Sequence, residues 1–329
     1  MSTQLPVPAT PPGLPRDRYA FAMTTRPLKV GIQLPEVERD VRWSELLDLT
    51  RAIEDLGFDS VWVGEHLLYR WEDRPARGPW EAWTLLAAIA ASTNRIELGP
   101  LVACTNFHNP ALLAKQAVTI DELSGGRFVL GLGAGWNETE FRAYGYPYDH
   151  RIDRFEEAFT IIRTLLREGF IDFDGRWYQA RDCELLPRGP RPGGPPLMIG
   201  SKGPRMLRAT MAHADSWNAW FNDTQNRPEG IPAVRAAVDE ACREVGRDPA
   251  EVERTVAVLV RLPGGAGRLQ GSTQPAIAPV DGDPAVLAET LRGFAREGIA
   301  HVQLVLDPIT LDAIRAVAPA LADLDRGGA

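Results

Sequence analysis

From Leu28 onward, short runs rich in β-branched and aromatic residues alternate with longer amphipathic segments. The strand-like runs lie at 28–34, 60–63, 95–102, 128–132, 197–199, 216–220, 255–262 and 302–306. Apolar residues at helical spacing predict helices at 43–56, 83–91, 111–123, 151–168, 204–213, 231–245 and 310–324. This alternation predicts repeated βα units joined in a parallel sheet.

Capping and turn residues mark the ends of several segments. Asn109-Pro110 supplies an N-cap acceptor followed by proline at the first helical position, and Gly125 stands where that helix should end. Asp174-Gly175, between two aromatic runs, predicts a small hairpin within residues 170–192. The boundaries therefore agree with the periodicity.

Eight strands, most of them followed by a helix, predict a (β/α)8 TIM barrel rather than an open doubly wound sheet. In such a barrel the loops after the carboxyl ends of the strands form the active face. Three of these loops are long, at 67–80, 136–150 and 263–284. We expect these insertions to build the pocket.

Composition limits the function classes. The chain has 329 residues, 44% of them hydrophobic, and a formal net charge of -8. An acidic chain is a poor general binder of nucleic acid or anionic membranes. Three widely spaced cysteines predict neither a disulfide framework nor a CxxC site, and a cytoplasmic location fits them.

The segment 1–26 carries many prolines for its length and has no periodic apolar pattern. We therefore interpret 1–26 as a flexible leader, dispensable for chemistry, and 27–325 as a single barrel domain. No run approaches the length needed to cross a bilayer.

Residues 199–205 end a predicted strand and open a predicted helix. Gly200 and Gly203 permit close approach, backbone N–H groups at the helix start can face an anion, and Lys202 and Arg205 add positive charge. The segment, Gly200-Ser201-Lys202-Gly203, is a candidate phosphate loop. A tight turn with incidental surface cations is the alternative.

A second glycine-rich segment, Gly131-Leu132-Gly133-Ala134-Gly135, follows the fourth predicted strand. Because three βα units precede it, a Rossmann dinucleotide site is disfavoured. In a barrel these glycines would let a flat ring or a phosphate approach the strand end, with Asn137 supplying a hydrogen bond. A glycine-rich crossing that bulky side chains cannot fill is an equally good interpretation.

Glu65-His66 follows the second strand directly, so both side chains can point into the barrel mouth. Histidine can exchange a proton near neutral pH, and Glu65 could orient it or titrate itself. A packed histidine is the structural alternative. The other histidines show no zinc spacing, so a metal-dependent hydrolase is disfavoured and we predict no metal site.

Several segments together resemble the luciferase-like flavin and deazaflavin oxidoreductases, which are TIM barrels. They are residues 61–66 (VWVGEH), 109–115 (NPALLAK), 123–127 (LSGGR) running into 131–136 (GLGAGW), 200–205 (GSKGPR) and 214–218 (ADSWN). The resemblance covers about Leu28 to Leu321. It implies a small-molecule substrate and a homodimer.

The resemblance also implies roles for individual residues. Leu101-Val102 occupies the place of a strand bulge with a non-prolyl cis peptide that supports the cofactor ring, and Cys104 lies near the ring edge. Residues 200–203 match the family's phosphate loop, Asn137 a ring-contacting asparagine, and His66 a histidine that some members use as acid or base.

The run 131–136 resembles the branch that uses coenzyme F420, so the resemblance implies an F420-dependent hydride transfer. The alternative is FMN and a two-component monooxygenase; a non-catalytic flavin-binding protein is a further possibility. In F420-dependent sugar-phosphate dehydrogenases a glutamate stands shortly before the asparagine, where this chain has Trp136. That departure puts sugar-phosphate oxidation in doubt, although Glu138 or Glu140 could substitute.

Overall fold

The computed structural model describes residues 26–72, 74–266 and 277–326. The α-helices are α1 (Trp43–Asp55), α2 (Ala82–Ser92), α3 (Pro110–Ser124), α4 (Glu138–Tyr144), α5 (Arg151–Glu168), α6 (Pro204–Thr210), α7 (Ile231–Glu244), α8 (Pro284–Arg296), α9 (Leu311–Val317) and α10 (Pro319–Arg326). The strands are β1 (Lys29–Gln33), β2 (Ser60–Val63), β3 (Glu97–Pro100), β4 (Ala103–Cys104), β5 (Leu130–Gly133), β6 (Phe170–Asp174), β7 (Gln179–Glu184), β8 (Leu197–Ile199), β9 (Ser216–Ala219), β10 (Glu253–Arg261), β11 (Val280–Asp281) and β12 (His301–Asp307).

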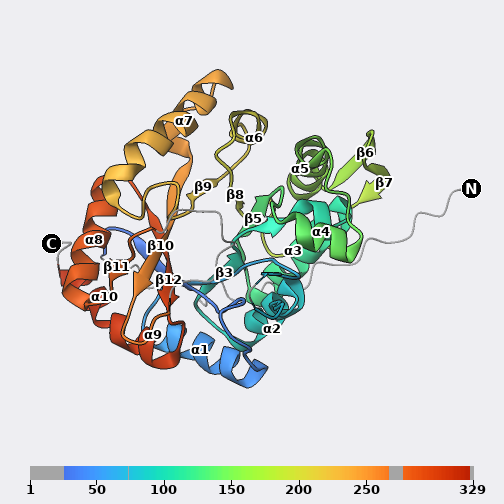
Figure 1. Ribbon diagram of the computed structural model, residues 1–329. Coiled ribbons are helices and arrows are strands. Elements are labelled where there is room, and N and C mark those ends of the chain that lie inside the picture. The colour runs from blue at the N-terminus through green and yellow to red at the C-terminus, as the bar shows by residue number, and fades with distance from the viewer. Residues whose placement is uncertain (1–25, 73, 267–276, 327–329) are drawn as a thin grey trace, which may run out of the picture.

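The main sheet is a parallel barrel. Strands β3, β2, β1, β12, β10, β9, β8 and β5 are neighbours in that order, and the ring closes where Val129 N donates to Leu98 O at 2.9 Å. Strand β4 continues beyond β3 and pairs with β5. The helices lie outside the ring of strands (Figure 1). The predicted TIM barrel is confirmed.

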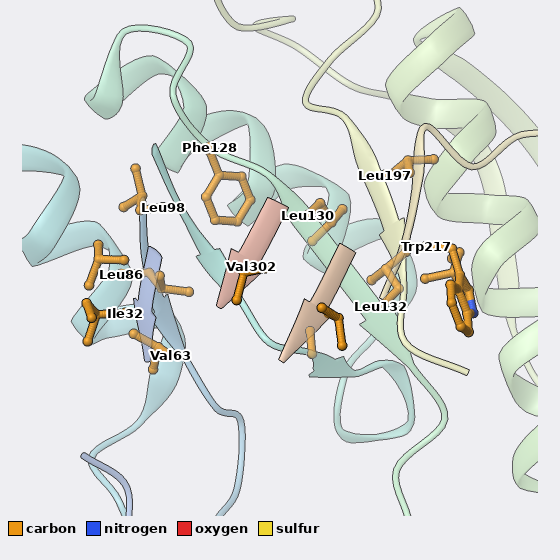
Figure 2. Packing of buried hydrophobic residues seen from close by; sticks show 14 of the residues in the cluster. Ile32, Val63, Leu86, Leu98, Phe128, Leu130, Leu132, Leu197, Trp217 and Val302 are labelled. Carbon is orange, nitrogen blue, oxygen red and sulfur yellow. The ribbon is translucent and has the colours of Figure 1, made fainter. Parts of the chain in front are cut away.

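Burial explains why short apolar runs became strands. Strands β2, β5 and β12 are buried along their whole length, as expected when helices cover the outside of a parallel sheet. Ile32, Val63, Leu98, Leu132 and Val302 belong to one continuous hydrophobic cluster, part of which is drawn in Figure 2. Each such side chain contributes roughly 1.5–3 kcal/mol when it leaves water.

The structure differs from the prediction in four elements. The third strand, expected over 95–102, ends at Pro100 as β3, and β4 follows at Ala103–Cys104. Between them lies the cis peptide at Leu101-Val102, as the family resemblance implied. The final helix is two helices, because Pro319 lacks the N–H that would continue α9. Helix α4 forms within the expected loop 136–150. Helix α8 was not predicted, although Asp283 caps it by accepting from Ala285 N and Val286 N.

The hairpin predicted within 170–192 is present as the antiparallel pair β6 and β7. Of the expected leader 1–26, only Arg26 lies within the described residues, and the loop 263–284 is described only in part. Arg26 Nε bonds Asp325 Oδ1 at 3.0 Å and its Nη1 bonds Asp59 Oδ2 at 3.3 Å, joining the two ends of the barrel chain. None of the described helices is long and apolar enough to span a membrane.

Candidate active site

A cavity of about 540 Å³ opens at the carboxyl ends of the barrel strands. Its lining residues follow β1, β2, β4, β5, β8 and β9, so the loops that the barrel brings together form one pocket. The lining includes Glu36, Glu65, His66, Tyr69, Leu101, Val102, Ala103, Cys104, Gly133, Ala134, Gly135, Trp136, Glu140, Arg151, Ile152, Gly200, Ser201, Lys202, Gly203, Met206, Asn218, Trp220 and Asp223.

The Val102 side chain packs against glycines, at positions where any larger residue would clash with it. A Cβ on Gly133 would stand 2.9 Å from Val102 Cγ2, and one on Gly200 would stand 2.9 Å from both Val102 methyl carbons. Gly131 is crowded in the same way, with Val102 Cγ1 at 3.0 Å. The glycines of β5 and of the loop after β8 thus accommodate the bulge that carries the cis peptide, and the bulge forms a wall of the cavity.

Glu65 is a buried carboxylate with three partners. Its Oε1 accepts from Trp83 Nε1 at 2.8 Å and lies 2.7 Å from His108 Nε2, while Oε2 accepts from Cys104 N at 2.6 Å. These bonds tie the end of β2 to α2, to the segment before α3 and to β4. Glu65 therefore holds the backbone immediately after the bulge, a role that its sequence position did not indicate.

Cys104 faces the cavity from β4. Burial, and secondly the negative charge of Glu65, raise the pKa of its thiol well above the usual value. The thiol is thus held in its neutral form. It packs beside Gly135, whose positive φ of 73° and close contacts admit no side chain.

His66 has a specific partner on α4. Its Nδ1 lies 3.0 Å from Glu140 Oε1, and Glu140 Oε2 accepts from Leu67 N at 2.8 Å. The Glu140 side chain is 1% exposed, so this carboxylate is fixed between the imidazole and the loop backbone. Engagement of Nδ1 by a carboxylate orients the ring at the edge of the cavity.

The predicted phosphate loop, residues 200–203, lines the cavity beside the bulge, since Gly200 packs against Val102. Lys202 pairs with Asp223 across the mouth, and its side chain is 68% exposed. Arg205 instead bonds Asp153 and Glu156, and it is not among the lining residues. The positive charge available to an anion at this loop is therefore that of Lys202.

The structure gathers most of the predicted site residues around one cavity. Asn137 is the exception, since it is absent from the lining and its Nδ2 donates to Leu68 O at 3.0 Å. Sequence reasoning missed Glu36, Tyr69 and Arg151, and named Glu140 only as a possible substitute. His66 and Glu140 are 74 residues apart in the sequence, so their contact could not be predicted from sequence pattern.

Six tryptophans in or near the strand ends and the loops that follow them divide into three groups. Trp62 and Trp217 are core residues, 1% and 2% exposed, while Trp136 and Trp220 line the cavity. Trp71 stacks on Tyr69, with ring centroids 5.8 Å apart, and Trp80 donates to Val41 O. Within the described residues no three His, Cys, Asp or Glu side chains are grouped to hold a metal ion.

The barrel and its mouth cavity define a class of (β/α)8 proteins that bind a ligand among the loops following the strands. Residues 24–262 match the family model described as luciferase-like monooxygenase. The chain belongs to this luciferase-like family.

Its relatives include F420-dependent enzymes. The chain is 34% identical over 220 residues to a 5,10-methylenetetrahydromethanopterin reductase of Archaeoglobus fulgidus, a match covering 67% of this chain and 60% of that protein. It is 32% identical over 250 residues to an F420-dependent glucose-6-phosphate dehydrogenase of Intrasporangium calvum, covering 73% and 72% of the two chains.

Solved structures show the same fold with two cofactors. An F420-dependent secondary alcohol dehydrogenase in complex with an F420-acetone adduct superposes with a TM-score of 0.74 at 20% identity, covering 89% of this chain and 99% of the other. The FMN-bound oxygenating constituent of 3,6-diketocamphane monooxygenase from Pseudomonas putida gives 0.68 at 15% identity, covering 92% and 99%.

Proposed function

We propose that this protein is an F420-dependent oxidoreductase that transfers a hydride between the deazaflavin and a small organic substrate. The observation that carries the proposal is the cavity at the ends of the barrel strands, one wall of which is the Leu101-Val102 bulge that the glycines of β5 and of the loop after β8 accommodate. Relatives at 30–34% identity that are named for F420 or for reductase activity support it.

The residues present fit such a group. A flat tricyclic ring needs a wall to lie against, and the Leu101-Val102 bulge, which packs on Gly133 and Gly200, forms such a wall of the cavity. A phosphate needs backbone N–H groups and a cation, which Ser201, Lys202 and Gly203 can supply. We therefore assign Leu101, Val102, Cys104 and Gly135 to the ring, and residues 200–203 to the phosphate.

When bound, the deazaflavin would supply or accept the hydride, so the protein's own task is orientation, desolvation and proton transfer. We assign proton transfer to the imidazole of His66, because it lines the cavity and Glu140 holds it in place. We assign Glu65 to positioning, because its three bonds hold Cys104 N and so fix the end of the bulge.

Titration of the apoprotein with F420 and, separately, with FMN tests the assignment. We expect selective micromolar binding of F420, and about two- to fivefold weaker binding by Lys202→Ala, because an exposed cation contributes on the order of 0.5–1 kcal/mol. Arg205→Ala is the matched control, since Arg205 is bound to Asp153 and Glu156 and should not change affinity. Selective FMN binding would instead favour the two-component monooxygenase, and binding of neither would refute the proposal.

His66→Ala should lower turnover at least about 100-fold while changing the Kd of F420 less than about threefold, because proton transfer contributes roughly 10²–10⁴-fold. Steady-state rates and the same titration measure both quantities. Unchanged turnover would remove His66 from the mechanism.

We further propose a homodimer located in the cytoplasm, as the family resemblance suggests. Light scattering after size exclusion should give a mass of about twice the 36.2 kDa of one chain. A mass of one chain would contradict the dimer. Fractionation of the native cell would test the compartment.

A further inference from the structure

Trp136 is a large aromatic side chain that lines the cavity and is nevertheless 57% exposed. Exposed aromatic surface at the rim of a cavity is unfavourable in water and is typical of a ligand contact. Trp80 is a useful comparison, because it is 56% exposed but does not line the cavity.

The backbone around Trp136 is anchored on both sides. Tyr148 Oη donates to Trp136 O at 3.1 Å, Asn137 Nδ2 donates to Leu68 O at 3.0 Å, and Arg151 donates to Gly135 O. Much of the conformational entropy of this segment is therefore lost on folding and not on binding. The segment that carries the indole is therefore held in place before a ligand binds.

Trp136, Tyr69 and His66 together form what we call the aromatic corner. The ring centroids of His66 and Tyr69 are 4.7 Å apart, those of His66 and Trp136 are 5.7 Å apart, and those of Tyr69 and Trp136 are 6.2 Å apart. Two aromatic rings thus flank the imidazole. A molecule that binds in the cavity beside His66 therefore has two aromatic rings within reach, and flat conjugated molecules gain most from contact with them.

The charged group that the His66 ring bonds is a carboxylate, and Arg151 brings a cation next to Trp136 through its hydrogen bond to Gly135 O. Glu140 bonds His66, and Glu36 packs against Gly64, two residues before His66. Among the described residues that line the cavity, the permanent cations are Lys202 and Arg151, which come from the β8–α6 loop and from α5. Lys202 pairs with Asp223, and Arg151 lies over the Tyr148 ring at 4.2 Å. An anion beside His66 would therefore meet carboxylates in a partly desolvated site, which is costly.

We propose that the aromatic corner selects a planar, conjugated organic substrate without negative charge, with Trp136 as its main specificity-determining contact. The inference rests on the proposed function, since it names the substrate class of the same site. It excludes phosphorylated sugars and small carboxylates as substrates.

Calorimetric titration with a matched pair of probes tests this inference. Coumarin is planar and neutral, coumarin-3-carboxylate adds one negative charge to the same ring system, and glucose 6-phosphate is the sugar-phosphate probe. Each is titrated into the F420-loaded protein and into the cofactor-free protein. The F420 titration is made first on every variant, so that loss of cofactor binding is recognised separately.

We expect coumarin to bind about tenfold or more tightly than its carboxylate, and glucose 6-phosphate not to bind. Trp136→Ala should weaken coumarin binding about tenfold, Trp136→Phe should keep it within about threefold, and Trp80→Ala should leave it unchanged. Failure of coumarin to bind either form, equal or tighter binding of either anion, or unchanged affinity in Trp136→Ala would overturn the inference. Failure of F420 to bind the wild-type protein would refute the proposed function instead.

Discussion

At the scale of single residues, the contact between His66 and Glu140 is the most informative. Both carboxylate oxygens of Glu140 are used, one by His66 Nδ1 and the other by the backbone N–H groups of Leu67 and Leu68. Glutamine has one acceptor oxygen and one donor nitrogen, so a glutamine that accepts from the backbone N–H groups can only donate to Nδ1 and fixes the other tautomer of the ring. A carboxylate at this place is therefore able to accept from both sides.

Glu140→Gln should lower turnover about tenfold or more and change the Kd of F420 less than about threefold, because the imidazole loses its carboxylate acceptor while the cofactor wall is untouched. Glu138→Gln is the matched control, since Glu138 on the same helix forms an exposed pair with Arg142. Steady-state kinetics and cofactor titration measure the two effects. Equal loss in both variants would indicate damage to α4 as a whole.

The sequence could predict part of this site. The position of Glu65-His66 at a strand end, and the two glycine-rich loops, follow from local pattern alone. The separate roles of Glu65 and His66 do not follow from local pattern. Glu65 is held by Trp83, Cys104 and His108, and only the closed barrel brings these residues together. Long-range contacts of this kind leave no periodic pattern.

At the scale of elements, the bulge between β3 and β4 depends on glycines in other elements. Because a Cβ on Gly200 would stand 2.9 Å from both methyl carbons of Val102, the alanine variant forces either the bulge or the phosphate loop to move. The strand run 95–102 appeared continuous in sequence, since the break arises from backbone geometry that apolar pattern does not encode.

Gly200→Ala should lower the free energy of unfolding by about 1–3 kcal/mol, as overpacking of a dense interior does. The double variant Val102→Ala/Gly200→Ala should lose less free energy of unfolding than the two single variants lose together, because the shorter side chain at position 102 removes the clash. Urea denaturation of the four proteins measures the coupling. Additive effects would show that Val102 is not what restricts Gly200.

Helix α8 was missed in the prediction from sequence for a different reason. Asp283-Pro284 is the same start signal as Asn109-Pro110, with the aspartate accepting from Ala285 N and Val286 N. The signal stands at the end of the Gly- and Pro-rich stretch 263–284, which was interpreted as one long loop. Local capping chemistry was sufficient to find the helix, and the composition of the preceding segment obscured it.

At the scale of the whole molecule, Arg26 marks where the barrel begins. Its guanidinium bonds Asp59, Asp325 and Gly57 O, and its side chain is 5% exposed. Removal of residues 1–25 should therefore leave both the urea midpoint and F420 affinity unchanged. Adding Arg26→Ala to that truncation should cost about 1–3 kcal/mol, because buried partners lose their donor. A truncation that is itself destabilising would disprove the prediction of a dispensable leader.

The barrel interior also sets a pH dependence of stability. His301, buried at the start of β12, shares a hydrogen bond of 2.7 Å with Ser60 Oγ. Burial, and secondly the charge of Lys29, lower the pKa of His301 from 6.5 to about 3. Between these two pKa values the unfolded chain binds one more proton than the folded protein, so the free energy of unfolding falls as the pH falls.

Other buried groups act in the opposite direction. Burial is the main cause that raises the pKa of Asp59 and of Glu253, so the folded state keeps their protons to higher pH than the unfolded state does. Their stabilising effect is present at low pH and is lost as the pH rises through the folded pKa values. The wild-type profile therefore sums opposing slopes, and a variant is needed to isolate the histidine.

His301→Gln removes the titration of one group and keeps a polar side chain beside Ser60. Between pH 7 and pH 5 the wild-type protein should lose about 2 kcal/mol more of its free energy of unfolding than the variant does. Urea denaturation at the two pH values measures the difference. Any packing cost of the substitution is the same at pH 7 and at pH 5, so the comparison at pH 7 gives that cost separately. If wild type and variant lose the same amount, the acid sensitivity must come from the carboxyl groups, and His301 must take up its proton in the folded barrel as readily as in the unfolded chain.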